Sequence, residues 1–449
     1  MTALLHCRLW FCSLWFCVTW LFSLPAFAAG LSGDQLQQRL AAARMLGQQL
    51  TPMGAEQAGT PPDELLPALP PWRGGLRTPP PEFDGTLQNP YAREAAVATI
   101  QQDQLAQWNR LLPTGLKVLL QQVAPLIRVY PSHRSATAPE SQFELAYRNR
   151  IRVDRTLNGG FQYGQGAIPF PQPAKGDELL WNHLLAWRGT RFDGKALQIQ
   201  AELHSNDVSS TEMLWQVSEQ WPWHQADNSG CGHACLGEQA EWHQEQQMLL
   251  ERHWQLLSTG DLANTNRPGE QGAGSWQQQL YLDAGKPMND VNLMGKWPEG
   301  WQNGAELPQT VELFNSLPAE YHWSVLGKSE LVVPYHNYPV TFDDARKDAA
   351  HVEQWVASLR FEKHRVWVVD GALRKGASNR YRKRVYYIDE DSWQILVADF
   401  YDASGGLQAV GLNLLYSDYR TLMTRSSGQA LFDLGKQSID LIRYIEQSE

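Results

Sequence analysis

Three adjacent carboxylates, Asp389, Glu390 and Asp391, are the residues of this sequence whose types most directly indicate chemistry. Carboxylates act as general acids or bases and bind metal ions, but both roles need side chains that converge on one point. Neighbours on one loop do not converge in this way, whereas turns favour Asp and Ser because their side chains bond to nearby backbone. The sequence therefore favours a four-residue hairpin turn at 389–392 over a catalytic or metal site.

A hairpin about this turn determines which residues of the flanking strands face each other. Antiparallel pairing sets three pairs opposite one another: Ile388 with Trp393, Tyr386 with Ile395, and Arg382 with Asp399. The last pair has opposite charges, so we predict a cross-strand ion pair between Arg382 and Asp399.

Both faces of this predicted hairpin are apolar. One face carries Ile388, Trp393, Tyr386, Ile395 and Val397, and the other carries Val385, Leu396, Tyr381 and Phe400. A simple exposed antiparallel sheet is apolar on one face only. Either helices cover both faces, or one face lines an apolar ligand cavity.

Histidines are the other side chains with catalytic potential. Of His133, His183 and His364, His183 could orient a nucleophile or bind a metal ion. His364 opens a predicted strand, where we expect a surface or cross-strand role. The sequence contains no Gly-x-Ser-x-Gly elbow, no His-Glu-x-x-His pair and no phosphate-binding loop. We therefore expect His183 to be a hydrogen-bonded helix histidine, and we expect no enzymatic activity, catalytic residue, metal or cofactor.

The N-terminus has the pattern of a secretory signal peptide. His6 and Arg8 precede an apolar run at 9–24, and Pro25-Ala26-Phe27-Ala28 places small residues before a cut after Ala28. An uncleaved anchor is the alternative, but about sixteen apolar residues are short for a membrane span. We expect residues 1–28 to be removed and the mature chain to reside in the periplasm, either free or peripheral to the outer membrane.

Two of the five cysteines, Cys231 and Cys235, lie beyond that signal peptide. An exported compartment is oxidising, so this pair predicts a small disulfide. A metal site that includes His233 and a pair of free thiols are the alternatives, although zinc sites usually draw on two separated ligand pairs. The net charge of −10 argues against a nucleic-acid partner, because phosphate binding needs a basic surface.

These residues must be positioned by three successive regions of the mature chain. Ser32 and Gln35 have capping-box spacing and begin a predicted helix at 29–51. Residues 52–90 are rich in proline and predict extended chain, either a linker or a strap, with Trp72 and Phe83 favouring the strap. Residues 91–449 predict one domain with a divergent middle at 195–310, and the strand pattern is strongest after Tyr321.

Several stretches resemble the domain-of-unknown-function family 1329, which comprises exported proteins of Gram-negative bacteria that are similar to outer-membrane lipoprotein-sorting proteins. The resemblance is carried by LTPMGAEQAG at 50–59, RVYPSHRS at 128–135, GAIPFPQP with WNHLLAWRG at 166–189, FNSLPAEYHWSVLGKSELVVPYHNY at 314–338, and HRVWVVDGALRKG through YIDEDSWQILVADFYD at 364–402. It implies a mainly β (α+β) fold. The expected architecture is a large curved antiparallel sheet that forms an incomplete barrel, with helices on the concave side.

The resemblance also implies a function. Lipoprotein carriers, which this family resembles, hold acyl chains in an apolar cavity. We therefore expect a non-enzymatic periplasmic carrier or accessory protein for a lipid or other hydrophobic molecule. The expected partners are an outer-membrane barrel protein and an export pump of the resistance-nodulation-division type. The expected ligand-binding residues are Trp181, Tyr386, Trp393, Ile395 and Phe400.

An envelope glycan-binding module is the alternative function. Exposed tryptophans beside Gln and Asn stack on sugars, and the middle region holds six candidates: Trp215, Trp221, Trp223, Trp242, Trp254 and Trp276.

Overall fold

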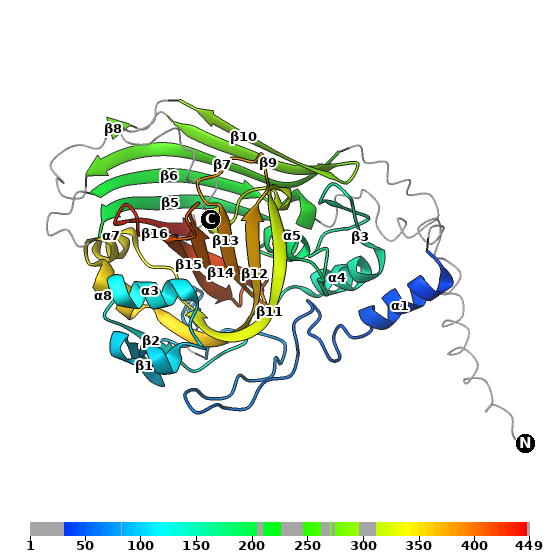
Figure 1. Ribbon diagram of the computed structural model, residues 1–449, viewed down its shortest axis with the longest axis horizontal. Helices are drawn as coiled ribbons and strands as arrows, with labels where there is room; N and C mark the ends of the chain where they lie inside the picture. The colour runs from blue at the N-terminus through cyan, green and yellow to red at the C-terminus, as the bar shows by residue number, and fades with distance from the viewer. Residues whose placement is uncertain are drawn as a thin grey trace, which may run out of the picture.

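The computed structural model describes residues 31–81, 83–203, 210–225, 246–261, 270–271, 274–295 and 311–446 (Figure 1). The predicted signal peptide, Cys231 and Cys235 lie outside these residues. The helices are α1 (Gly33–Ala43), α2 (Leu105–Trp108), α3 (Thr114–Gln122), α4 (Glu140–Arg152), α5 (Gly176–Leu184), α7 (Phe342–Ala350) and α8 (Val352–Ser358). Short 3₁₀ turns are η3 (Gln102–Gln104), η4 (Pro222–His224), η7 (Val311–Leu313) and η8 (Pro318–Glu320). Among the described residues, no helix is both long and apolar enough to cross a membrane.

One sheet of 15 strands dominates the molecule. Its strands are β1 (Ala98–Gln101), β2 (Leu126–Tyr130), β5 (Arg191–Glu202), β6 (Ser210–Gln220), β7 (Gln246–Asp261), β8 (Glu270–Gln271), β9 (Ser275–Asp283), β10 (Lys286–Met294), β11 (Tyr321–Pro334), β12 (Arg360–Leu373), β13 (Lys383–Asp389), β14 (Ile395–Tyr401), β15 (Leu407–Asp418), β16 (Met423–Asp433) and β17 (Ser438–Glu446). A separate small ladder pairs β3 (Asp154–Arg155) with β4 (Phe161–Gln162).

The large sheet is curved and does not close. Its order runs β1-β2-β12-β13-β14-β15-β16-β17-β5-β6-β7-β9-β10, with β11 and β8 paired beside this path. The long strands β6, β7 and β9 run across the direction of β12 to β14 in Figure 1. The prediction of a mainly β, incomplete barrel with packed helices is confirmed. One pairing, between β2 and β12, is parallel, so the sheet is mixed rather than wholly antiparallel.

Each face of the sheet buries its own apolar cluster. The tryptophan cluster includes Trp181, Trp215, Trp254, Trp276 and Trp393, and it contains residues of α4 and α5. The leucine cluster includes Leu116, Leu119, Leu412, Leu414 and Leu441, and it contains residues of α3, α7 and α8. Successive strand residues point to opposite faces, so strands such as β5 and β14 supply residues to both clusters. Helices therefore cover both faces, which was one of the two options that the apolar hairpin left open.

The hairpin between β13 and β14 forms where the sequence predicted it, but with a different register. Ile388 lies opposite Ile395, Tyr386 opposite Ala398, and Asp399 opposite Val385, with an irregularity after Tyr387. Residues 390–394 form the connection, and Trp393 adopts a left-handed φ of 60° there. The longer turn shifts every pair.

The shifted register makes the predicted cross-strand pair of Arg382 and Asp399 wrong. Asp399 instead accepts hydrogen bonds from the Gly115 backbone (3.0 Å) and the Tyr387 hydroxyl (3.0 Å). The Arg382 backbone N–H donates to the Tyr401 carbonyl (2.9 Å) beside the first residue of β13.

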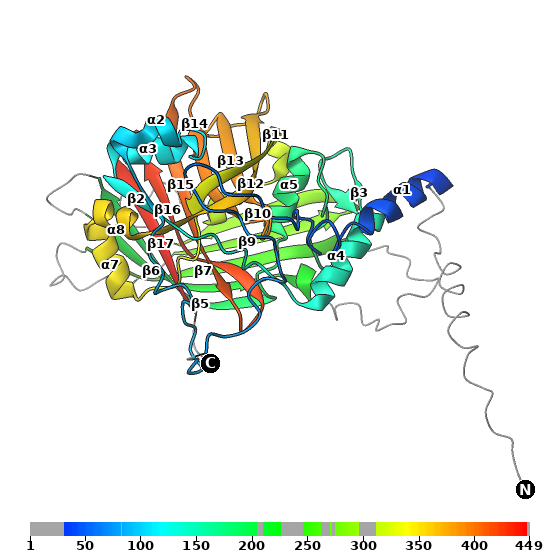
Figure 2. The ribbon, with the colours of Figure 1, turned by 90° about the horizontal axis from the view of Figure 1, so that it is seen from below.

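The N-terminal segments lie against this body. Ser32 and Gln35 form the predicted capping box of α1, but the helix ends at Ala43 rather than near residue 51, because the chain turns repeatedly from Arg44 onward. In the proline-rich segment the Trp72 indole donates to the Ala136 carbonyl (2.9 Å), and Leu66 is buried. Figure 2 shows α1 at the edge of the molecule beside α4.

Candidate functional site

The five expected ligand-binding residues come together in the tryptophan cluster. Trp181 lies on α5, Tyr386 on β13, Ile395 and Phe400 on β14, and Trp393 in the turn, and each is at most 1% exposed. The two indole N–H groups are hydrogen-bonded to backbone carbonyls: Trp181 donates to Gly159 (2.8 Å), and Trp393 donates to Met53 (2.9 Å). In this conformation the five residues form packed core.

An open cleft of about 480 Å³ lies elsewhere. It is lined chiefly by polar and aromatic side chains, among them Arg155, Asp177, Tyr321, His322, Trp323 and Arg374. None of the five expected ligand-binding residues lines this cleft. The cleft is therefore distinct from the apolar interior.

A short loop lies within the apolar interior formed by the tryptophan cluster. Residues 311–316, which we call the plug loop, include η7 and place Val311, Leu313 and Phe314 at 0% exposure in the tryptophan cluster. The Phe314 ring packs edge-on against Tyr386, with centroids 5.7 Å apart. η7 contacts β14, β15 and β16. The plug loop thus occupies the space beside an expected ligand-binding residue.

Buried charges fasten the plug loop. The Glu312 carboxylate pairs with Arg188 (2.7 Å) and with Arg252, and the Glu312 backbone N–H donates to Gln429 Oε1 (2.6 Å). Burial alone raises the pKa of Glu312, but the two arginines outweigh it and lower that pKa to about 2. Glu312 therefore stays ionised and links the loop to Arg188, which follows α5, and to Arg252 of β7.

The plug loop also carries unfavourable features. Glu312 and Leu313 have left-handed φ values of 53° and 65°, which cost about 1–2 kcal/mol each for residues other than glycine. Three buried polar atoms at or near the loop have no hydrogen-bond partner among the described residues: Asn315 Nδ2, Ser316 Oγ and His183 Nε2. Unpaired buried polar groups cost about 1–3 kcal/mol each. The loop is thus held in place by contacts that offset local strain.

His183 lies on α5, is buried and is hydrogen-bonded. The sequence predicted a hydrogen-bonded histidine on a helix. Its Nδ1 accepts a hydrogen bond from the Ile395 backbone N–H (3.3 Å). Burial and the nearby Arg188 lower the pKa of His183 to about 3, so the imidazole is neutral. This arrangement supports the hairpin rather than a nucleophile.

A second group of polar side chains surrounds the acidic turn. Asp389, Glu390 and Asp391 do form a turn, but they point inward and are 0%, 1% and 8% exposed. Arg134 donates from Nε to Asp391 Oδ2 (2.8 Å) and from Nη2 to Asp391 Oδ1 (2.7 Å). Glu390 pairs with Arg365 (2.9 Å) and Lys328 (2.9 Å). The turn prediction did not anticipate this burial.

Beside the turn lies a chain of hydrogen bonds with the order of a Ser–His–acid triad. Ser135 Oγ lies 2.6 Å from His336 Nε2, and His336 Nδ1 lies 2.6 Å from Glu362 Oε1. Ser135 Oγ also lies 2.6 Å from Ser417 Oγ, and Ser135 is only 2% exposed. A nucleophile needs room for a substrate carbonyl, and the buried Ser135 leaves no such room. These hydrogen bonds instead join the residue after β11, His336, to Glu362 of β12.

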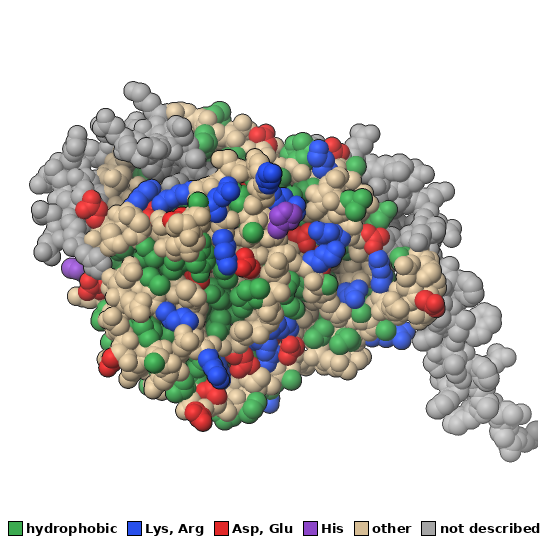
Figure 3. All heavy atoms as spheres, viewed as in Figure 1, with side chains coloured by type: hydrophobic (Ala, Val, Ile, Leu, Met, Phe, Trp, Pro, Cys, Tyr) green, Lys and Arg blue, Asp and Glu red, His purple; other side chains and the backbone are tan. Residues whose placement is uncertain are grey.

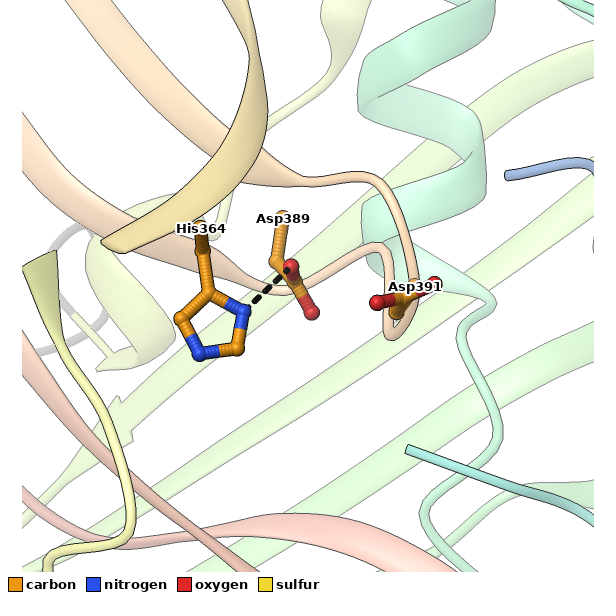
Figure 4. Close-up of side chains that lie close together, drawn as sticks. All are labelled: His364, Asp389 and Asp391. Carbon is orange, nitrogen blue, oxygen red and sulfur yellow. Dashed lines mark ion pairs between the residues drawn. The ribbon is translucent and has the colours of Figure 1, made fainter. Parts of the chain in front are cut away.

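His364, Asp389 and Asp391 bring their potential ligand atoms within 4.8 Å of one another (Figure 4). All three are buried. Burial, with Asp391 close by, raises the pKa of Asp389. These are the described residues that could hold a metal ion.

The sequence did contain a signal for this polar group. Glu362, Lys363, His364 and Arg365 are consecutive residues inside β12, and all four are buried. Neighbouring strand residues face opposite sides, so four ionisable residues in a row require polar partners on both faces. Arg134 and the turn carboxylates supply partners from distant parts of the chain.

Sequence comparison finds a matching protein family and a related protein. The family described as "Protein of unknown function (DUF1329)" matches residues 99–234 and 298–448. An uncharacterized protein of Pseudomonas aeruginosa, PA3922, is 29% identical over 401 residues, which cover 82% of this chain and 79% of that protein.

Solved structures with partial similarity share little sequence with this chain. A DUF1329 family protein from Desulfovibrio piger has 9% identity over 57% of this chain and 85% of that chain, with a TM-score of 0.32. A LolA superfamily protein from Nitrosomonas europaea, NE2245, has 9% identity over 62% of this chain and 95% of that chain, with a TM-score of 0.33.

Proposed function

Because this chain belongs to the DUF1329 family, we propose that it is a non-enzymatic carrier or accessory protein that binds a lipid or other hydrophobic molecule. One observation carries the proposal: the plug loop, and not only the side chains of the sheet, fills the apolar interior around Tyr386 and Phe400. In this proposal a hydrophobic ligand takes the place of Leu313 and Phe314.

The apolar contributions to such an exchange are close to balanced. An alkyl chain that enters the interior gains about 25 cal/mol per Å² of buried apolar area, and the departing Leu313 and Phe314 side chains lose a similar amount per Å². Release of the loop also relieves its two left-handed residues. Against this, Glu312 must separate from Arg188 and Arg252, so the ion pairs determine how readily the interior opens.

The glycan-binding alternative loses the observation that motivated it. Trp215, Trp221, Trp223, Trp254 and Trp276 are at most 3% exposed, and Trp242 lies outside the described residues. Buried indoles cannot stack on a sugar, so these five are core residues rather than a binding platform.

The setting of the proposed carrier is the periplasm, with transport between the inner and outer membranes. An outer-membrane barrel protein and a resistance-nodulation-division export pump stay predictions as partners. On the face viewed in Figure 3, side chains of both charges are interspersed, which differs from the continuous basic surface that a nucleic-acid partner needs.

Ligand uptake by a Phe314→Ala variant tests the proposal. Removing the ring leaves the Glu312 ion pairs in place and vacates space beside Tyr386. We expect the variant to bind a fluorescent fatty acid several-fold more tightly than the wild type, measured by fluorescence titration. Lipid mass spectrometry of the purified wild-type protein is expected to detect a co-purified lipid.

Phe432→Ala is the matched control. Phe432 is equally buried but belongs to the leucine cluster on the other face, so it creates a similar cavity without affecting the plug loop. Equal uptake by both variants would point to non-specific binding in any cavity. If the wild type carries no lipid and neither it nor Phe314→Ala takes up the fatty acid, the carrier proposal is wrong.

A further inference from the structure

We propose that His364, Asp389 and Asp391 form a binding site for a divalent transition-metal cation. This site is independent of the proposed carrier function. His364 comes from the middle of β12, and the two aspartates come from the end of β13 and the turn that follows (Figure 4). The three side chains thus converge from β12, β13 and the turn that follows β13.

An unpartnered oxygen points into this group. Asp389 Oδ2 accepts hydrogen bonds from the Tyr335 hydroxyl (3.1 Å), the Ser392 backbone (2.9 Å) and the Ser392 hydroxyl (2.6 Å). Asp389 Oδ1 is buried and accepts no hydrogen bond from any described residue. Buried carboxylate oxygens are normally paired, so Oδ1 requires a further partner.

The nearest candidate for that partner stands at a distance that a metal ion fits. His364 Nδ1 lies 3.8 Å from Asp389 Oδ1, which is too long for a hydrogen bond. Nitrogen and carboxylate ligands each lie about 2.0–2.2 Å from a bound zinc ion. One cation can therefore contact both atoms without moving either side chain far.

Neighbouring residues orient the imidazole for this role. His364 Nε2 lies 3.3 Å from Glu362 Oε2, so a proton on Nε2 leaves the Nδ1 lone pair directed toward Asp389. The Tyr335 ring stacks on His364, with centroids 3.9 Å apart. Metal-binding histidines typically donate their second ring N–H to a carboxylate in this way.

Asp391 is oriented by Arg134. The guanidinium donates one hydrogen bond to each carboxylate oxygen, and each oxygen keeps a second lone pair for a metal. The guanidinium charge weakens cation binding at this position, but carboxylates are in excess nearby. Two groups of ion pairs surround the site. One runs from Asp63 to Asp391, and the other runs from Glu94 through His364 to Asp389. Together they hold eight carboxylates but only five arginine or lysine side chains.

The donor set indicates the class of metal. One imidazole nitrogen and two carboxylate oxygens suit the borderline ion Zn²⁺ or the harder ion Mn²⁺ better than a soft ion such as Cu⁺. Bound there, the cation would fasten the turn at 390–394 to β12. Its effect is therefore expected on stability as well as on metal content.

Metal analysis of the purified full chain tests this site. We expect about one equivalent of metal by mass spectrometry after purification without chelator. After chelator treatment, addition of ZnCl₂ or MnCl₂ is expected to raise the melting temperature. In Asp389→Asn, which keeps the size of the side chain, we expect the affinity from calorimetric titration to fall at least about tenfold.

Asp399→Asn is the matched control, because Asp399 is a buried carboxylate with partners of its own and belongs to a different group of side chains. It is expected to bind metal like the wild type. Equal metal binding by Asp389→Asn would assign the metal to another site, such as Cys231 and Cys235, and would overturn the proposal. So would a wild type that holds no metal and whose melting temperature neither salt changes, a result that does not require either variant to fold.

Discussion

Asp399 is a carboxylate whose burial must affect stability. Its side chain is fully buried in β14 and has two hydrogen-bond donors but no ion pair among the described residues. Burial raises the pKa of Asp399 from 3.8 to about 7. Between pH 3.8 and about 7, Asp399 is therefore protonated in the folded state, whereas the unfolded chain has already released that proton.

This pKa predicts that the wild type loses stability as pH rises. The contribution of Asp399 is fully present below pH 3.8 and is lost as pH rises to about 7. At about 1.4 kcal/mol for each pH unit, the loss amounts to about 4 kcal/mol. We expect Asp399→Asn to reduce this dependence, measured as the free energy of unfolding in urea at pH 5 and pH 8. An unchanged slope for Asp399→Asn, compared with the exposed control Asp343→Asn, would refute the assignment.

The acidic turn shows what residue patterns predict and what they omit. Asp and Ser at 389–392 indicated a turn correctly, because turn preference is local. The register was wrong because a left-handed Trp393 is uncommon, and no local pattern announces it. Burial of the carboxylates depends on Arg134, which lies far away in the sequence, so spacing within the hairpin carried no information about it.

At the scale of elements, the plug loop determines the identity of a residue in the neighbouring strand. Gly411 in β15 lies under Leu313, and a Cβ atom there would lie 2.6 Å from Leu313 Cδ2. This contact is closer than side chains tolerate, so an alanine at 411 must displace the plug loop or distort the strand.

Gly411→Ala is therefore expected to destabilise the protein by about 1–3 kcal/mol, measured by urea unfolding. Combining it with Leu313→Ala removes the clash, so the double variant should recover at least about 0.5 kcal/mol relative to additivity. Gly406→Ala serves as the control, because a Cβ there meets nothing closer than 3.5 Å. Strict additivity of Gly411→Ala and Leu313→Ala would mean that the loop does not press on β15 in solution.

Elements with strong periodic or capping signals were predictable, and those defined by long-range packing were not. The capping box of α1 was recognised from Ser32 and Gln35 because it is a local hydrogen-bond pattern. The plug loop was not recognised, since its burial depends on Arg188 and Arg252 from other regions. The expected ligand-binding residues lie in one buried cluster, but the packing of Phe314 against Tyr386 was not foreseen.

At the scale of the whole molecule, the divergent middle region is part of the main sheet. β5 pairs along its length with β17, the final strand, through residues such as Ile199 opposite Leu441. The sheet therefore continues from the C-terminal strands directly into β5, β6, β7 and β9. A division of this body into independently stable halves would have to break that ladder.

We expect a single cooperative unfolding transition as a consequence. Tryptophan fluorescence, to which Trp215, Trp254 and Trp276 of the middle region contribute, should change at the same urea concentration as far-UV circular dichroism. A Trp393→Phe variant weights the fluorescence further toward the middle region and should keep the two midpoints coincident. Two separated transitions would show that the middle region unfolds on its own and that 91–449 is not one domain.

The hydrogen bond from the Trp393 indole to the Met53 carbonyl has a consequence for how a newly made chain matures. The proline-rich segment is synthesised early, yet its docking surface includes a hairpin that emerges near the end of synthesis. Contacts between such distant parts of a chain form slowly. Until the hairpin is made, the early segment, with Leu66 and Trp72, is exposed to solvent. We therefore expect a chaperone that binds the nascent chain to bind this segment.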